Sequence, residues 1–161
     1  MENPDYVYIE PSQPDIRNYR ELIKKQITCR YEISSEKISH DASTFTFGYL
    51  VYLQRAQIGR RSIKSLNDRF NSSSSILLSF ILCNYTNAAP DQVFIELICS
   101  NNKTGKFLIE LAEEKVRSMG IKRICLFSLD KDRLINWYKS LGYVFVNKNF
   151  DTKLSLIMKY I

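Results

Sequence analysis

The sequence almost completely lacks histidine, because His40 is the only one among 161 residues. A Ser-His-Asp or Cys-His catalytic site would need that residue, and no nucleophile-elbow motif accompanies it. A zinc site would be equally short of ligands. His40 lies in the polar stretch 34–43. We therefore expect it to be a solvated loop residue, and we expect no bound metal.

Closely spaced cysteine pairs are also lacking. The sequence has four cysteines, at positions Cys29, Cys83, Cys99 and Cys125. No two of them have the CxxC spacing. Three of them lie inside apolar segments and the first follows one. We interpret them as small buried hydrophobic residues that a reducing compartment keeps as thiols.

Long hydrophobic runs are missing as well. The longest, residues 76–83, has the length of a buried strand and is too short to cross a bilayer. The segment 1–11 has neither the basic start nor the apolar core of a secretory signal. We expect a soluble protein of the cytoplasm with no membrane partner, and a nuclear location stays open.

The net charge of +6 is spread thinly along the chain. The only adjacent basic pairs are Lys24-Lys25, Arg60-Arg61 and Lys122-Arg123. A positive excess attracts anions, and a nucleotide-type cofactor would account for part of it. Nucleic acid remains an alternative partner, although no basic run reaches the density of a nuclear signal.

Hydrophobic patterning predicts one mixed α/β domain over residues 1–161. In the first half we expect strands at 6–10, 45–53 and 76–85, a helix at 15–27, and an irregular or weakly helical segment at 32–44. In the second half we expect strands at 93–99, 123–129, 143–146 and 154–160, with helices at 106–119 and 131–141. Gly120 and Gly142 would end the two helices. Alternating strands and helices after a run of strands favour a sheet covered by helices.

The turn from Cys99 to Lys106 has the chemistry of an anion site. The first amides of a helix lack internal acceptors and the helix dipole favours negative charge there. Gly105 would allow close approach of a phosphate to the backbone. Lys103 and Lys106 stand at the positive end of the helix, where acidic residues would be the stabilising choice. An anion shared between them, or two solvated surface lysines, are equal alternatives at this point.

Residues 93–146 resemble the core of the GNAT superfamily of acetyl-CoA-dependent N-acetyltransferases. The resemblance is carried by the stretches FIELIC (94–99), KTGKFLI (103–109) and WYKSLGY (137–143). The family's phosphate loop usually reads Arg/Gln-x-x-Gly-x-Gly/Ala. Alignment of its last position on Gly105 puts Ser100 at the Arg/Gln position and Lys103 at the first glycine, so two of three defining positions differ.

The resemblance implies a GNAT-like, mostly antiparallel sheet of six to seven strands flanked by helices. It also implies acetyl-CoA as cosubstrate. The strand at 93–99 would separate from its neighbour and expose backbone groups of Leu97, Ile98 and Cys99 to the pantetheine arm. The phosphates would be bound in the loop, and the implied cofactor-binding residues there are Asn102, Lys103, Thr104, Gly105 and Lys106.

The resemblance assigns catalytic roles to two residues. Tyr138 is implied as the general acid that protonates the departing thiolate and also contacts the cofactor. A phenol suits this task because its ordinary pKa of about 10 exceeds that of a thiol. Glu96 interrupts an apolar strand and is implied as the base that removes the amine proton. The alternatives are a core aromatic for Tyr138 and an edge-facing or salt-bridged carboxylate for Glu96.

We therefore predict an N-acyltransferase in which a primary amine attacks acetyl-CoA directly. A backbone amide on the separated strand would stabilise the oxyanion. Cys99, near the expected thioester, is the one residue that offers a covalent route instead. The alternatives are an inactive protein of the same fold that binds a partner, and a basic nucleic-acid-binding module. The resemblance implies that residues 15–40 and 86–92 determine the acceptor amine, which belongs to a protein or to a small molecule. We expect a monomer or a homodimer.

Overall fold

A seven-stranded sheet forms the centre of the molecule. The computed structural model describes residues 6–9, 23, 35–54, 75–86, 89–100, 104–129 and 131–161. Its strands are β1 (Tyr6–Ile9), β2 (Phe47–Gln54), β3 (Ser75–Asn84), β4 (Val93–Cys99), β5 (Arg123–Leu129), β6 (Val144–Asn149) and β7 (Leu154–Tyr160). Their order across the sheet is β1-β2-β3-β4-β5-β7-β6. All neighbours are antiparallel except β4 and β5, so the predicted mixed, mostly antiparallel sheet is confirmed.

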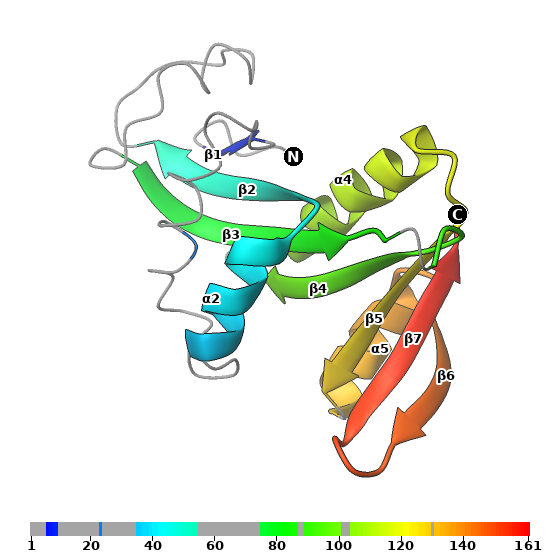
Figure 1. The fold of residues 1–161 in the computed structure, drawn as a ribbon. Coiled ribbons are helices and arrows are strands. Elements are labelled where there is room, and N and C mark those ends of the chain that lie inside the picture. The colour runs from blue at the N-terminus through cyan, green and yellow to red at the C-terminus, as the bar shows by residue number, and fades with distance from the viewer. Residues whose placement is uncertain are drawn as a thin grey trace.

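Within the described ranges, the sheet is covered by helices α2 (Ser35–Thr44), α4 (Gly105–Ser118) and α5 (Asp132–Ser140). Figure 1 shows α2 on one face of the sheet and α4 and α5 on the other. The apolar stripe of α4 is fully buried in the main core, and α5 contributes Tyr138 to the same core. None of the described helices is long and apolar enough to cross a membrane.

The continuous apolar run of β3 is buried on both faces, as its sequence predicts. Phe80, Ile81, Leu82 and Cys83 are each 0% exposed. Helix α4 covers one side of this strand and α2 contacts it as well. Gly120, at φ +74°, takes the left-handed conformation expected just after α4.

The segment around His40 differs from its prediction. It forms the regular helix α2, with His40 exposed on it rather than in a loop. Two buried residues, Ile38 and Asp41, fix the helix against the sheet. Lys37 Nζ donates a 2.8 Å hydrogen bond to Asp41 Oδ2 one turn away. Among the α2 residues whose side chains are described, only these two are buried. So few apolar positions give no clear helical period in the sequence.

The expectation of four thiols is wrong for Cys99. Cys83 and Cys125 are free and buried, as predicted, whereas Cys99 is disulfide-bonded. Short-range spacing misses such a bond because disulfide pairing depends on distance in space rather than along the chain. The helix expected at 15–27 lies outside the described residues except for Ile23, which is helical and 0% exposed.

Candidate active site

The only parallel pair of the sheet opens partway along its length. Strands β4 and β5 pair from Val93 with Ile124 to Ile95 with Leu126, and no further. Both strands continue, to Cys99 and to Leu129, with their ends unpaired to each other. The predicted separation is confirmed. Backbone groups that would bond across a regular sheet are therefore available to a ligand.

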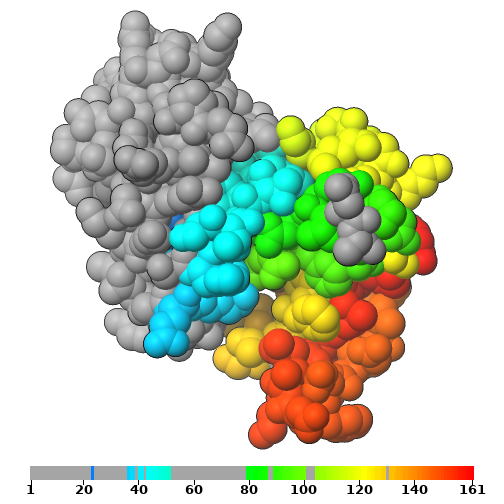
Figure 2. All heavy atoms as spheres, in the orientation of Figure 1, coloured from blue at the N-terminus to red at the C-terminus, as the bar shows by residue number. Residues whose placement is uncertain are grey.

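A cavity of about 790 Å³ lies at this opening. It is lined by the diverging ends of β4 and β5, by the first turn of α4, and by one side of α5. Figure 2 shows the surface hollowed between α2, in cyan, and the orange-to-red β6–β7 region. Ligand sites favour such concave places where secondary-structure elements diverge.

One end of the cavity is shaped by Gly105. A Cβ atom on Gly105 would lie 2.6 Å from Oγ of Ser100 and 3.0 Å from Cζ2 of Trp137. A larger residue would have to displace both side chains. Helix α4 begins here, with no acidic residue in its first turn and no side-chain cap from Thr104. The first amides of α4 therefore keep their capacity to bind an anion.

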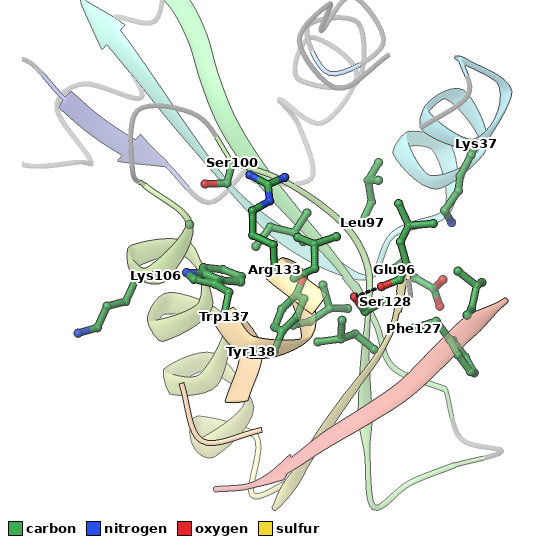
Figure 3. Close-up of a pocket in the computed structure, with 17 residues that line it drawn as sticks. Lys37, Glu96, Leu97, Ser100, Lys106, Phe127, Ser128, Arg133, Trp137 and Tyr138 are labelled. Atoms are coloured by element: carbon green, nitrogen blue, oxygen red, sulfur yellow. Dashed lines mark hydrogen bonds between the residues drawn. The ribbon is translucent and has the colours of Figure 1, made fainter. Parts of the chain in front are cut away.

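Two cations stand at this end of the cavity. Figure 3 shows Arg133 extending from α5 toward Ser100, across the cleft from the start of α4. Lys106 also lines the cavity, but its side chain is 68% exposed and is directed outward. Its Nζ lies 3.9 Å from Oε1 of Glu110, which is a weak surface pair. Arg133 is thus the better-placed of the two for a bound anion.

Tyr138 lines the middle of the cavity. Its ring projects from α5 (Figure 3) and is only 5% exposed. The ring makes edge contacts with Trp137 and Tyr143, at centroid distances of 4.8 and 5.9 Å. Burial raises the pKa of the Tyr138 phenol well above its usual value. The hydroxyl therefore carries its proton throughout the neutral range.

Glu96 lies at the other end, toward α2. It is half-buried, lines the cavity, and forms no salt bridge with any residue that the structure describes. In Figure 3 its carboxylate faces the space between Lys37 and Phe127. Of the alternatives for Glu96, the structure supports the one in which the carboxylate faces a cleft.

Solved structures share this architecture, although no protein-family model and no curated protein sequence matches the chain. A putative N-acetyltransferase from Lactobacillus plantarum is 13% identical with a TM-score of 0.66, over 96% of this chain and 97% of that one. The IAA acetyltransferase from Bacillus cereus is 12% identical with a TM-score of 0.64, over 97% and 99%. The PaiA N-acetyltransferase from Thermoplasma acidophilum, in complex with coenzyme A, is 14% identical with a TM-score of 0.60, over 97% and 99%. The chain has the N-acetyltransferase fold.

The N-acetyltransferase fold brings six of the predicted site residues to one cavity, and these are Glu96, Leu97, Ile98, Gly105, Lys106 and Tyr138. Cys99 and Thr104 are buried beside it and do not line it. The Thr104 hydroxyl is hydrogen-bonded to Ser79 in the core. Asn102 and Lys103 lie outside the described residues. Among those described, no group of acidic, histidine or cysteine side chains forms a metal site.

Sequence reasoning missed Arg133 and Phe127, both of which line the cavity of this N-acetyltransferase fold. Arg133 precedes Tyr138 by five residues on α5, so its position in the first turn of a second helix was the available signal. Phe127 lies within an apolar strand, and nothing in such a strand distinguishes an exposed aromatic from a core one.

Proposed function

We propose that the protein is an N-acyltransferase that transfers the acetyl group of acetyl-CoA to a primary amine. The observation that carries this proposal is the separation of β4 and β5 beyond Ile95 and Leu126, with a cavity that is cationic at one end and carries a carboxylate at the other. The N-acetyltransferase fold supports it, and one solved neighbour is a complex with coenzyme A.

The residues present fit a CoA-type ligand. The amides at the start of α4, the glycine at position 105 and the guanidinium of Arg133 would hold the pyrophosphate. The family's phosphate loop usually has Arg or Gln at the position of Ser100. Arg133, which lies on α5 across the cleft, would supply the positive charge in its place. Leu97 and Ile98 pair with β3 but not with β5, and their backbone groups on the β5 side would bind the pantetheine arm. When bound, acetyl-CoA supplies an activated carbonyl carbon and a thiolate leaving group.

Two side chains would handle the protons. Glu96 accepts a proton from the attacking amine, directly or through a water molecule, and Tyr138 donates one to the departing sulfur. Burial raises the Tyr138 pKa, which keeps the phenol protonated but also disfavours a phenolate. Proton donation must therefore coincide with loss of the sulfur rather than precede it. A backbone amide on β4 would stabilise the developing oxyanion.

Direct transfer is favoured over a covalent route. Cys99 is disulfide-bonded and does not line the cavity, so it offers no thiolate there. Cys125 is buried on the neighbouring strand, and burial raises the pKa of its thiol, so it too is poorly suited to act as a nucleophile. A single domain over residues 1–161 and a cytoplasmic location complete this proposal, and both rest on the sequence.

The test is acetyl-CoA binding, followed by thiol release. Acetyl-CoA should raise the unfolding temperature, and calorimetry should give a saturable isotherm. Arg133→Glu should weaken binding, whereas Lys122→Glu, the same charge change at an exposed position outside the cavity, should not. Absence of binding at millimolar acetyl-CoA would contradict the enzyme and leave the inactive binding protein. Salt-dependent binding to oligonucleotides would instead favour the nucleic-acid alternative.

A further inference from the structure

The acceptor end of the cavity lies on the sheet face opposite α4. Along β4, Val93 and Ile95 are buried in the core beneath α4, so Phe94 points to the other face. The strand register shifts at Glu96, where Leu82 pairs with Leu97 and Cys83 pairs with Ile95, and Glu96 lines the cavity on the face of Phe94. Phe94 pairs in register with Cys125, which places Phe127 on the same face of β5. The contact between Phe94 and Phe127 confirms this, because their rings stack with centroids 5.9 Å apart and planes inclined by 13°.

This face presents apolar surface to the cavity. Phe127 is 54% exposed and Leu129 is 37% exposed, and both line the cavity. Leu154 also lines it and pairs in register with Leu129 across β5 and β7. Phe127 is restrained by its strand and by the Phe94 ring, so it offers a preformed flat surface.

The charge at this end is negative. Glu96 is the only carboxylate that lines the cavity among the described residues. Lys37 also lines it, but its ammonium is paired with the buried carboxylate of Asp41 at 2.8 Å. The Lys37–Asp41 pair is neutral as a whole, which leaves Glu96 to attract a single cationic group.

We propose that the acceptor is an arylalkylamine, a primary amine joined by a short alkyl linker to an aromatic group. This inference rests on the proposed function. The amino group faces Glu96 while the ring stacks on Phe127 and contacts Leu129 and Leu154. A polyamine or an aminoglycoside would place further ammonium groups over this apolar surface, where Glu96 is the one carboxylate among the described lining residues to compensate for their desolvation.

Each bond and each proton of the transfer can be assigned to a named group. The amine nitrogen lone pair forms the new C–N bond at the thioester carbonyl carbon, and the C–S bond breaks with its electron pair leaving on sulfur. The acceptor binds as an ammonium and first releases one proton to solvent, which frees the nitrogen lone pair. The nitrogen then loses a second proton to Glu96, and the sulfur gains one from Tyr138. Exchange with solvent returns a proton from Glu96 to Tyr138 after the products leave. The products are an N-acetylated arylalkylamine and the free thiol of CoA.

The experiment compares acceptors on the full chain. Thiol release is measured with 2-phenylethylamine, spermidine, an aminoglycoside and a short peptide with an N-terminal alanine. We expect kcat/KM for 2-phenylethylamine to exceed each of the others by at least about tenfold. Preferred turnover of any of the other three would overturn the inference. Calorimetry with 2-phenylethylamine in the presence of CoA gives a readout that needs no turnover, and acetyl-CoA binding without amine binding would also overturn it. Failure of acetyl-CoA itself to bind would contradict the proposed function instead.

A second experiment tests the aromatic surface. Phe127→Ala should raise KM for 2-phenylethylamine about three- to tenfold and leave KM for acetyl-CoA unchanged. Phe127→Tyr should retain the wild-type KM. Phe145→Ala is the matched control, because Phe145 is 48% exposed on β6 and does not line the cavity. Urea unfolding of each variant shows that it is folded. An unchanged acceptor KM in folded Phe127→Ala would overturn the inference.

Discussion

The two ends of the cleft are built in contrasting ways. At the α4 end, Gly105 is packed so closely against Ser100 and Trp137 that even one methyl group would require the Ser100 hydroxyl to move. At the α2 end, Phe127 leaves more than half of its surface exposed. The first end gathers cations and helix amides, and the second carries one carboxylate beside apolar side chains. A phosphate is bound by backbone groups, and their geometry must be fixed by the fold. An acceptor is contacted by side chains, and the identity of these side chains can differ between proteins that act on different substrates.

A buried ion pair links α4, which begins at one end of the cleft, to strand β7. Glu113 of α4 is 4% exposed, and Lys159 of β7 donates to its Oε1 at 2.6 Å. Lys159 also donates to the carbonyl of Leu141, just after α5, at 2.8 Å. The amide of Tyr143 then bonds the carbonyl of Tyr138 at 3.1 Å. The contacts of Lys159 thus join α4 to the carboxyl end of the helix that carries Tyr138.

The largest expected effect comes from the residue between the two ends. Tyr138→Phe should lower kcat at least about a hundredfold, because it removes the proton donor while keeping the ring. KM values for acetyl-CoA and for the amine should change less than about twofold. Steady-state thiol release measures all three.

Tyr143→Phe provides the matched control for that experiment. Tyr143 is 2% exposed, contacts the Tyr138 ring, and has a hydroxyl without a hydrogen-bond partner among the described residues. Its kcat should stay near that of the wild type. An equal loss in both variants would show that packing, not proton donation, explains the role of Tyr138.

The next effect distinguishes the two cations of the α4 end. Arg133→Glu should raise KM for acetyl-CoA about ten- to a hundredfold, since charge-assisted hydrogen bonds to phosphate are lost. Lys106→Glu should have the smaller effect, because its ammonium is exposed and directed outward. Both effects should diminish at high salt. A larger effect at Lys106 than at Arg133 would place the phosphates outside the cleft. The α4 end of the cleft would then no longer be the phosphate-binding end, and its proposed difference from the α2 end would be wrong.

Much of the fold follows from local patterns in the second half of the chain. Strands β4, β5 and β7 have the predicted bounds, and α4 is displaced by one residue. Their patterns are strong because each element buries a complete apolar face. The segment of α2 was expected to be irregular or weakly helical, since Ile38 and Asp41 are the only buried residues among its described side chains.

The site was predictable where a motif constrains it. Glu96, Gly105 and Tyr138 could be named because a charge in an apolar strand, a glycine before a helix and a Tyr-x-x-x-Gly pattern each leave a local sign. Arg133 left only its position in the first turn of a helix, and Phe127 left none. Their positions depend on how α5 packs across the opening and on which face of β5 stays uncovered, and both are properties of the assembled sheet.

A moderate effect is expected on stability rather than on chemistry. Glu113→Gln should lower the free energy of unfolding by about 1–3 kcal/mol, because Lys159 loses a charged acceptor in a largely buried place. Glu114→Gln on the same helix should cost less than about 0.5 kcal/mol, since Glu114 is 78% exposed and pairs with Arg117 at 3.3 Å. Urea denaturation measures both. Equal losses would show that the pair does not connect α4 to α5.

The smallest expected effect is in the alkaline pH profile. An unperturbed phenol loses its proton near pH 10. Burial raises the Tyr138 pKa above that value, so the protonated donor persists, and kcat should stay within about twofold from pH 8 to pH 10. The same shift stabilises the folded protein below the unfolded-state pKa, and this contribution is lost only as pH rises toward the folded-state pKa. A fall in kcat below pH 10 that disappears in Tyr138→Phe would show that the phenol is solvated in the working enzyme. Tyr138 would then belong to the open acceptor end of the cleft rather than to its closed interior.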